Sequence, residues 1–213
     1  MIPLANLVAF AIVAIPLILA PGPSVLFVIG RSLSLGKIGG LLSVVGNAIG
    51  GIVVVMAVAF GVGILIAQSV IVFTIVKIVG AAYLIYLGVQ AIRHRRATAD
   101  AATAPIGRSA PWRVLAQGFL VGVSNPKTIV FFIAVLPQFV DYTAGNISLQ
   151  LLTLGTLFIV IALGTDAVWA LVAGVARDWF ARSPRRIAGL GATGGVMMIG
   201  IGVGSLVIGH GKD

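Results

Sequence analysis

Two long stretches of this chain contain no charged residue. Ile2–Gly30 and Ile38–Val76 carry no Asp, Glu, Lys or Arg. A membrane-spanning helix needs about 20 mostly apolar residues, so each stretch is long enough to cross a bilayer. Over the whole chain only 9% of the residues are charged, against about 25% in an average soluble domain. The pattern therefore predicts an integral membrane protein and excludes an ordinary soluble enzyme.

The apolar stretches divide into six segments of membrane-spanning length. Ile38–Val76 is too long for one span and breaks most naturally at Gln68-Ser69. The expected spans then cover residues 2–30, 39–66, 70–91, 114–136, 148–175 and 187–209. The apolar runs are continuous rather than alternating, which indicates helices rather than strands. We therefore expect an all-α integral membrane protein with six transmembrane helices and no separate soluble domain.

Basic residues are distributed unevenly between the two sides that six spans create. Eleven of the 14 Lys and Arg residues fall in the loops after the first, third and fifth spans. These residues are Arg31, Lys37, Arg93, Arg95, Arg96, Arg108, Arg113, Arg177, Arg182, Arg185 and Arg186. Cytoplasmic loops collect Lys and Arg, so the asymmetry predicts that both termini face the periplasm. Binding of RNA or acidic lipid by Arg93–Arg96 is the alternative explanation of that basic run.

The two halves of the chain carry similar landmarks. Each half begins with a span that proline breaks, at Pro21-Gly22-Pro23 and at Asn125-Pro126-Lys127. Each third span carries two glycines eight residues apart, namely Gly80 and Gly88, then Gly194 and Gly202. Three spans per half place related halves upside down to each other, a signature of secondary transporters. The expected layout is one domain over 1–213, with halves 1–92 and 113–213 and a flexible cytoplasmic linker at 93–112.

Polar groups gather at one expected depth in the membrane. Asn47 and Asp166 each lie about 8–10 residues, or ~12–15 Å, from the cytoplasmic ends of their spans. The two proline breaks fall at comparable depth, and Lys127 follows the second break. Proline frees backbone groups, which in lipid must face protein, water or a ligand. We therefore expect a binding site in this layer, where secondary transporters place theirs.

Three motifs follow one another along nearly the whole chain. Residues 20–51, APGPSVLFVIGRSLSLGKIGGLLSVVGNAIGG, contain a Pro-Gly-Pro break and a Gly-xxx-Gly helix. The other two motifs are KIVGAAYLIYLG at 77–88 and NPKTIVFFIAVLPQFV at 125–140. Together they resemble the LysE/RhtB family of amino-acid exporters. The resemblance implies a bacterial inner-membrane exporter of amino acids or close derivatives, driven by the proton gradient. The family residues that it carries over are Pro21, Gly22, Pro23, Asn125, Pro126 and Lys127.

The polar layer can be matched to the two charges of an amino acid. A helix N-terminus after a proline break, with Lys127 beside it, can receive the carboxylate. Asp166 is the only carboxylate within the expected spans, and it can receive the ammonium or carry a coupled proton. Some family members have an acidic residue after the second-span Gly-xxx-Gly, where this chain has Gly51. The alternatives are structural: Lys127 pairs with Asp166 or caps carbonyls, and Asn47 joins two helices.

Other functions fit the composition less well. An exporter of metal or small inorganic ions on the same scaffold is the second hypothesis, but cation sites need several ligands. The chain has no Cys and no Glu, and His94 and His210 lie outside the expected spans. An intramembrane enzyme would need a His–Glu motif or paired acids. We expect a transporter without metal or cofactor, whose partners are amino acid, proton and lipid but not nucleic acid. Gly-xxx-Gly pairs predict close helix packing and leave a homo-oligomer seam open.

Overall fold

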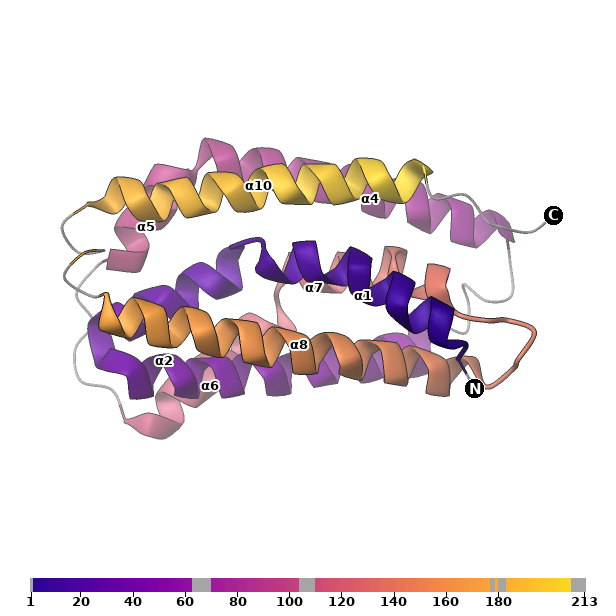
Figure 1. Ribbon diagram of the computed structural model, residues 1–213, viewed down its shortest axis with the longest axis horizontal. Helices are drawn as coiled ribbons and strands as arrows, with labels where there is room; N and C mark the ends of the chain where they lie inside the picture. The colour runs from indigo at the N-terminus through magenta and orange to yellow at the C-terminus, as the bar shows by residue number, and fades with distance from the viewer. Residues whose placement is uncertain (1, 63–69, 104–109, 177–178, 180–182, 208–213) are drawn as a thin grey trace.

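The computed structural model describes residues 2–62, 70–103, 110–176, 179 and 183–207. Every regular element among them is a helix, so the predicted all-α class is confirmed (Figure 1). The elements are α1 (Leu4–Leu19), α2 (Pro23–Ala57), η1 (Val58–Val62), α4 (Val70–Arg93), α5 (Arg95–Thr103), α6 (Pro111–Val123), α7 (Pro126–Ala134), η2 (Leu136–Phe139), α8 (Ile147–Val175) and α10 (Pro184–Val207). The described residues do not include the predicted break at Gln68-Ser69, nor Arg108, Arg177, Arg182 and His210.

Four helices of the described chain are long and apolar enough to cross a membrane. They cover Pro23–Gly61, Thr74–Arg93, Ile147–Val175 and Pro184–Leu206. A fifth candidate is the bent pair of Pro111–Val123 and Pro126–Phe139, whose helices meet at 40°. Helix α1 is apolar but has 16 residues, fewer than the roughly 20 that a bilayer requires. The structure thus supports a multi-pass membrane protein, whereas the number of six spans stays a prediction.

Helix α2 changes direction at Gly36, at one end of the bundle (Figure 1). Gly36 has φ 76° and ψ −177°, a backbone conformation that glycine adopts readily and side-chain-bearing residues rarely adopt. The change of direction divides α2 into a first arm that begins at Pro23 and a second arm that ends at Ala57. The loop expected between the first two spans is therefore reduced to a bend at one glycine.

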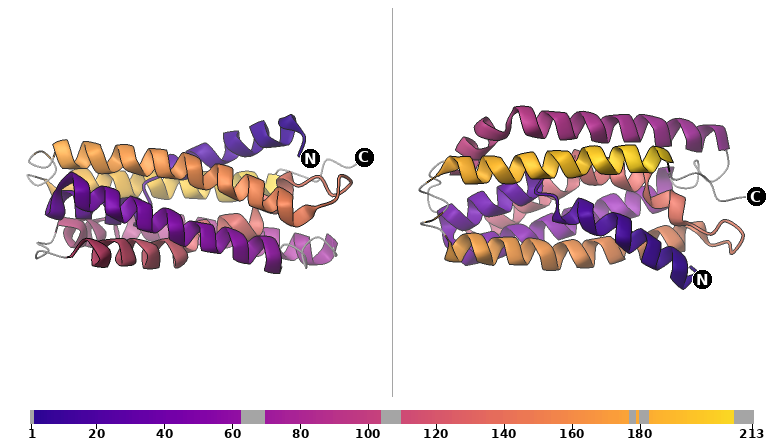
Figure 2. Two further views of the ribbon diagram at one scale, coloured as in Figure 1. Left: turned by 90° about the horizontal axis from the view of Figure 1, so that it is seen from below. Right: turned by 45° about the horizontal axis from the view of Figure 1, so that its top comes forward.

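In the view of Figure 1 the helices form two layers, with the short helices α1 and α7 between them, and Figure 2 shows that α1 reaches the outside of the bundle. Helices α4 and α10 lie side by side in one layer, and the second arm of α2 lies with α6 and α8 in the other. Between the layers, α1 contacts α8 and α10, while α7 contacts α4. One face of α1 is nevertheless exposed, with Leu4 75% and Ile12 65% accessible, whereas the chain break that follows α1 is buried at Ala20.

Glycines bring neighbouring helices into close contact within each layer. A side-chain carbon at Gly118 of α6 would collide with the backbone of Ser43 on α2. Between α4 and α10, such a carbon at Gly88 would lie 2.5 Å from the carbonyl oxygen of Gly195, and the reverse distance is also 2.5 Å. The predicted role of glycine in close helix packing is confirmed at these positions, inside one chain.

Aromatic side chains join α1 and α7 to α8. Phe10 and Phe131 are completely buried, and their ring centroids lie 6.0 Å apart. Phe158 of α8 lies 5.3 Å from the ring of Phe131 and 4.9 Å from that of Phe132, the latter edge-on. These contacts hold the two short helices in place beside the chain breaks.

The predicted linker at 93–112 contains a helix. Arg95–Thr103 forms α5, which packs on α2 and α10. Ala99 of α5 is 1% exposed and belongs to a cluster with Leu26 and Ile187. The expectation of a flexible connection is wrong for these residues, because tertiary packing stabilises a helix too short to form alone.

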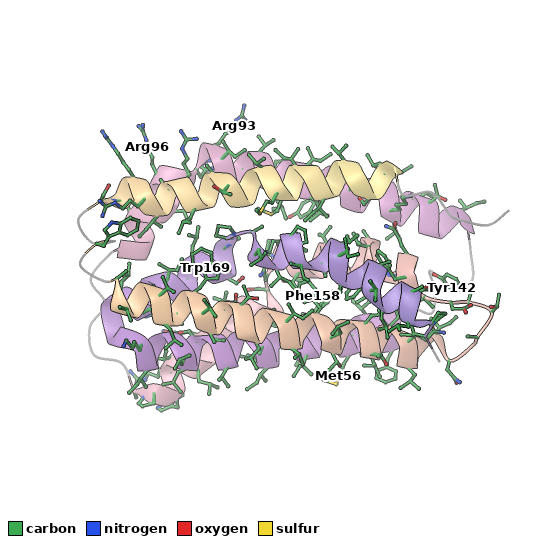
Figure 3. All side chains as sticks on the ribbon, viewed as in Figure 1. Met56, Arg93, Arg96, Tyr142, Phe158 and Trp169 are labelled. Carbon is green, nitrogen blue, oxygen red and sulfur yellow. The ribbon has the colours of Figure 1, made fainter. Side chains whose placement is uncertain are left out.

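The start of α1 and the end of α10 lie at one end of the bundle, and α5 and the bend of α2 lie at the other (Figure 1). Arg93 and Arg96 are exposed and project outward near α5, whereas Tyr142 lies near the opposite end (Figure 3). We call the region of α5, Arg93 and Arg96 the basic corner. The free ends of α1 and α10 thus lie at the opposite end of the bundle. That placement agrees with the charge asymmetry, and the cytoplasmic identity of the basic side stays a prediction.

Candidate functional site

The two proline motifs lie against each other in the middle of the bundle. Helix α1 ends at Leu19 and α2 begins at Pro23, while α6 ends at Val123 and α7 begins at Pro126. The side chain of Asn125 caps α7 by accepting a hydrogen bond from the Lys127 amide at 3.2 Å. Its Nδ2 donates to the Ser24 hydroxyl at 3.0 Å. One asparagine therefore connects the first turn of α7 with the first turn of α2.

Lys127 satisfies backbone carbonyls at the end of α1. Its Nζ donates to the Leu17 oxygen at 3.0 Å and to the Ala20 oxygen at 2.9 Å. In a continuous helix the Leu17 oxygen would accept from the amide of residue 21, but Pro21 has no N–H. The ammonium also lies at a helix C-terminus, where positive charge is favourable. Of the two structural alternatives for Lys127, carbonyl capping is the one found.

Gly22 leaves the room that the lysine side chain needs. A side-chain carbon added at Gly22 would lie 3.2 Å from Lys127 Nζ and 3.3 Å from its Cδ and Cε. Lys127 itself is 3% exposed. The Pro-Gly-Pro motif therefore has a division of roles, in which proline leaves a carbonyl unpaired and glycine admits the cation that pairs it.

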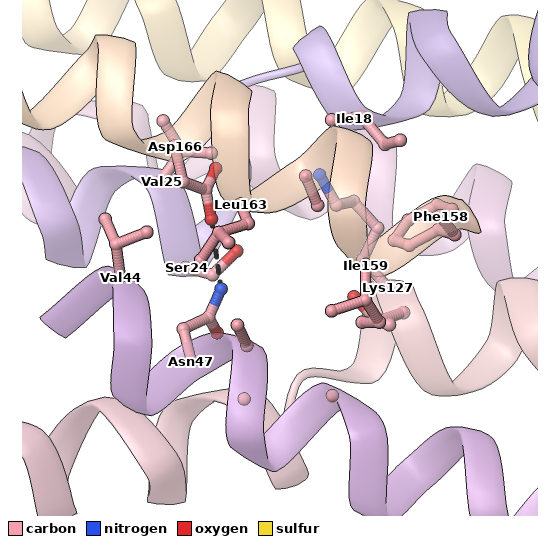
Figure 4. Close-up of a pocket in the computed structure, with 15 residues that line it drawn as sticks. Ile18, Ser24, Val25, Val44, Asn47, Lys127, Phe158, Ile159, Leu163 and Asp166 are labelled. Carbon is pink, nitrogen blue, oxygen red and sulfur yellow. Dashed lines mark hydrogen bonds between the residues drawn. The ribbon is translucent and has the colours of Figure 1, made fainter. Parts of the chain in front are cut away.

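Asp166 of α8 is paired with an amide rather than with the lysine. Asp166 is 4% exposed, and its Oδ2 accepts a hydrogen bond from Asn47 Nδ2 at 3.0 Å (Figure 4). No ion pair within 4.0 Å joins Asp166 to Lys127, both of which are among the described residues. Asn47 thus connects α2 to α8, and it leaves the carboxylate with further capacity to accept hydrogen bonds.

A narrow cavity, which we call the central cavity, lies between these polar groups (Figure 4). Its polar lining comprises Ser24, Asn47, Lys127, Thr128 and Asp166, and its apolar lining includes Phe158, Ile159 and Leu163. The cavity volume is about 30 Å³, enough for water but far below the ~300–1,000 Å³ of small-molecule sites. In this conformation the central cavity therefore has no room for an amino acid.

Two helix N-termini face the cavity. Ser24 and Val25 belong to the first turn of α2, and Lys127 and Thr128 belong to the first turn of α7. The first amides of a helix lack intrahelical partners and, with the helix dipole, favour an anion. A carboxylate at this end and an ammonium near Asp166 would each meet opposite charge. The groups around the cavity are therefore complementary to the two charges of a zwitterion.

The structure brings together most of the residues expected from the sequence. Asn47, Lys127 and Asp166 line the cavity, as does Gly51, while Asn125 holds the two breaks together. The remaining expected residues shape the breaks, and they are Pro21, Gly22, Pro23 and Pro126. Ser24 and Thr128 were not expected, although each directly follows a predicted helix start. Within the described ranges, no three His, Cys, Asp or Glu side chains gather as metal ligands would.

An all-helical membrane protein with a buried polar cavity between interrupted helices has the architecture of a secondary transporter. The protein is thus a multi-pass membrane transport protein and not an enzyme. Its residues 15–209 match the family model of the LysE type translocator, and the chain belongs to this family. The family resemblance noted from the sequence motifs is confirmed.

Individual relatives agree with the family assignment. An uncharacterized membrane protein of Vibrio cholerae is 34% identical over 92% of this chain and 93% of its own length. A leucine efflux protein of Salmonella typhimurium is 30% identical over 71% of each chain. An uncharacterized membrane protein of Pseudomonas aeruginosa is 34% identical over 87% of this chain and 88% of its own. No solved structure matches this chain.

Proposed function

We propose that this protein exports amino acids, or close derivatives of them, across the bacterial inner membrane. The observation that carries the proposal is the central cavity, which combines Lys127 and two helix N-termini with the carboxylate of Asp166. An amino acid is a zwitterion, and this arrangement complements both of its charges. A relative named for leucine efflux supports aliphatic amino acids among the substrates.

The proposed topology has six spans in two inverted halves. The first span combines α1 with the first arm of α2, and the fourth combines α6 with α7. The other spans are the second arm of α2, α4, α8 and α10. Both termini face the periplasm, because the basic residues around α5 collect on the opposite side. The two interrupted spans then meet near the middle of the membrane, where inverted-repeat transporters bind substrate.

Alternating access requires the narrow central cavity to widen toward each side of the membrane in turn. The interrupted spans are the elements best suited to move, since their backbones are already broken next to the cavity. The Asn125–Ser24 hydrogen bond ties the start of α7 to the start of α2. The bonds from Lys127 to Leu17 and Ala20 tie α7 to α1. Opening would break one set of these contacts and retain the other.

Proton antiport is the proposed source of energy. Asp166 is the one carboxylate on the described helices that can span a membrane. In the ionised form it attracts a substrate ammonium that arrives from the cytoplasm. A proton from the periplasm neutralises the carboxylate and weakens that attraction, which favours substrate release outside. The proton then leaves to the cytoplasm when the cavity faces inward again.

Uptake into inside-out membrane vesicles tests this function, because export then appears as accumulation. Vesicles with and without the protein would receive a panel of radiolabelled amino acids, with the lumen either acidic or at equal pH. We expect concentrative uptake of at least one neutral amino acid, lost when a proton ionophore is added. If correctly inserted protein accumulates none of the amino acids under either condition, the proposed function is wrong.

A further inference from the structure

A second cavity lies on the other side of Lys127, between the two layers of helices. We call it the α4–α5 vestibule and define it by its polar lining of Gln90, His94 and Thr98 and by the inner wall of Pro23, Pro126 and Lys127. Its volume is about 430 Å³, which falls within the ~300–1,000 Å³ of small-molecule sites. Because His94 is exposed, the vestibule reaches the surface at the basic corner of the bundle.

Lys127 lines both the central cavity and the vestibule. The two prolines that begin α2 and α7 line the vestibule, while the residues that follow them, Ser24 and Lys127, line the central cavity. The first turns of α2 and α7 therefore form the partition between the two spaces. A substrate that crosses the partition passes the Lys127 ammonium.

Gln90 lines the vestibule and carries an unpaired acceptor. Its Nε2 donates to the Tyr86 hydroxyl at 2.8 Å, whereas its Oε1 is buried and accepts no hydrogen bond from any described group. A buried acceptor without a donor is unfavourable and needs an explanation. Rotation of the Gln90 side chain would turn Oε1 into the vestibule, where a substrate ammonium would supply the donor.

The remaining lining indicates the chemical class of the substrate. Leu87, Ala91 and Met198 give the vestibule an apolar wall. Among the lining residues that the structure describes, none is Asp or Glu, and Lys127 adds a positive charge. A cationic side chain would thus find no counter-ion here. Exposed Arg93, Arg95 and Arg96 lie beside the opening and attract a carboxylate.

We propose that the α4–α5 vestibule is a second substrate site, where a neutral aliphatic amino acid binds from the cytoplasm before it passes Lys127. The aliphatic side chain packs on Leu87, Ala91 and Met198, the carboxylate approaches Lys127, and the ammonium donates to Gln90 Oε1. This inference rests on the proposed export of amino acids and adds an entry site with its own specificity residues.

Cysteine protection tests binding directly, because the natural chain contains no Cys. Thr98→Cys would be labelled with a membrane-impermeant maleimide in inside-out vesicles, with and without leucine. Ala97→Cys is the matched control, since Ala97 is the adjacent, exposed residue of α5 and does not line the vestibule. With leucine at about four times its Kd, labelling of Thr98→Cys should slow about fivefold by mass action, and that of Ala97→Cys should not change.

Transport kinetics test the role of Gln90. Gln90→Leu should raise KM for leucine about tenfold, the effect of one hydrogen bond to a charged group, with little change in kcat. Gln117→Leu is the matched control, because Gln117 Oε1 is also buried without a partner but lines neither cavity. Ala91→Trp should block uptake by filling the vestibule, whereas Ala82→Trp, on the exposed face of α4, should not.

The outcomes separate this proposal from the function on which it rests. If wild-type vesicles accumulate no amino acid, the proposed function fails and the entry site with it. If wild-type vesicles accumulate leucine but Thr98→Cys reacts equally fast with and without leucine, the vestibule is not a substrate site. Leucine uptake by folded Ala91→Trp at the wild-type rate would lead to the same conclusion. Slowed labelling together with a raised KM for Gln90→Leu supports the proposal.

Discussion

Lys127 on α7 donates to the Leu17 carbonyl on α1 at 3.0 Å and so replaces the backbone amide that Pro21 lacks. The two residues are 110 positions apart in the chain. Through this bond the second half of the protein completes a helix end in the first half. Lys127 lines both the central cavity and the vestibule, so its ammonium makes a structural contact and is also proposed to contact the substrate.

Lys127→Met should both destabilise the protein and abolish transport. The substitution leaves the Leu17 and Ala20 carbonyls without a donor, at a cost of about 3–6 kcal/mol for two bonds to a charged group. Thermal unfolding in detergent measures the first effect and vesicle uptake the second. Lys77→Met is the control, because Lys77 lines neither the central cavity nor the vestibule. Transport by Lys127→Met at the wild-type rate would show that the Lys127 ammonium does not contact the substrate.

Substitutions at Gly22 should reduce transport in order of size. A methyl group would lie 3.2 Å from Lys127 Nζ, so Gly22→Ala should be mild, whereas Gly22→Val should displace the lysine at about 1–3 kcal/mol. Uptake rates and melting temperatures of both variants check the order. Gly164→Ala is the control, because nothing lies within 4 Å of an added carbon there. Equal activity of Gly22→Val and wild type would contradict the close packing.

The contact between α2 and α6 predicts that alanine substitutions at two glycines differ in their effect on stability. Gly118→Ala places a methyl group against the Ser43 backbone and should lower stability by about 1–3 kcal/mol. Gly200→Ala has open space around the new carbon, and it should leave stability unchanged or raise it by up to about 1 kcal/mol. Unfolding of the two variants in the same detergent gives the comparison. Equal stability would show that α2 and α6 separate at little cost.

Asp166→Asn should reduce proton-driven transport but retain substrate exchange. The amide keeps the shape of the carboxyl group but cannot bind or release a proton. We expect at least a ~10-fold loss of uptake driven by a pH gradient, equivalent to about 1.4 kcal/mol, with substrate exchange retained at equal concentrations. Loss of both activities would indicate that Asp166 binds the substrate ammonium. Full gradient-driven uptake would mean that the proton binds elsewhere.

Reporter fusions should place the two ends of the bundle on opposite sides of the membrane. Alkaline phosphatase fused after Asp213 should be active, because the enzyme folds only in the periplasm, and the fusion at Thr103 should be inactive. Fusions of green fluorescent protein at the same positions should give the opposite pattern. An active phosphatase at Thr103 together with an inactive one at Asp213 would reverse the proposed topology.

The sequence by itself determined the class of the protein and the location of its breaks. Hydropathy and charge are properties of consecutive residues, so uncharged runs such as Ile2–Gly30 identify membrane helices without any tertiary contact. Proline acts on its own helix, and the breaks before Pro23 and Pro126 therefore follow from the local sequence. The sequence alone also identifies Lys127 and Asp166 as candidate site residues, because charges within membrane spans are costly in lipid.

Only the tertiary structure decided which partners these residues have. Lys127 caps α1 rather than pairing with Asp166, whose hydrogen-bond partner is Asn47, 119 positions away. Ser24 enters the site because Asn125 reaches it across 101 positions. The vestibule exists because α4, α5 and α10 pack beside two helix starts from different halves. Such contacts depend on how distant helices pack in space, and no local sequence pattern encodes that distance.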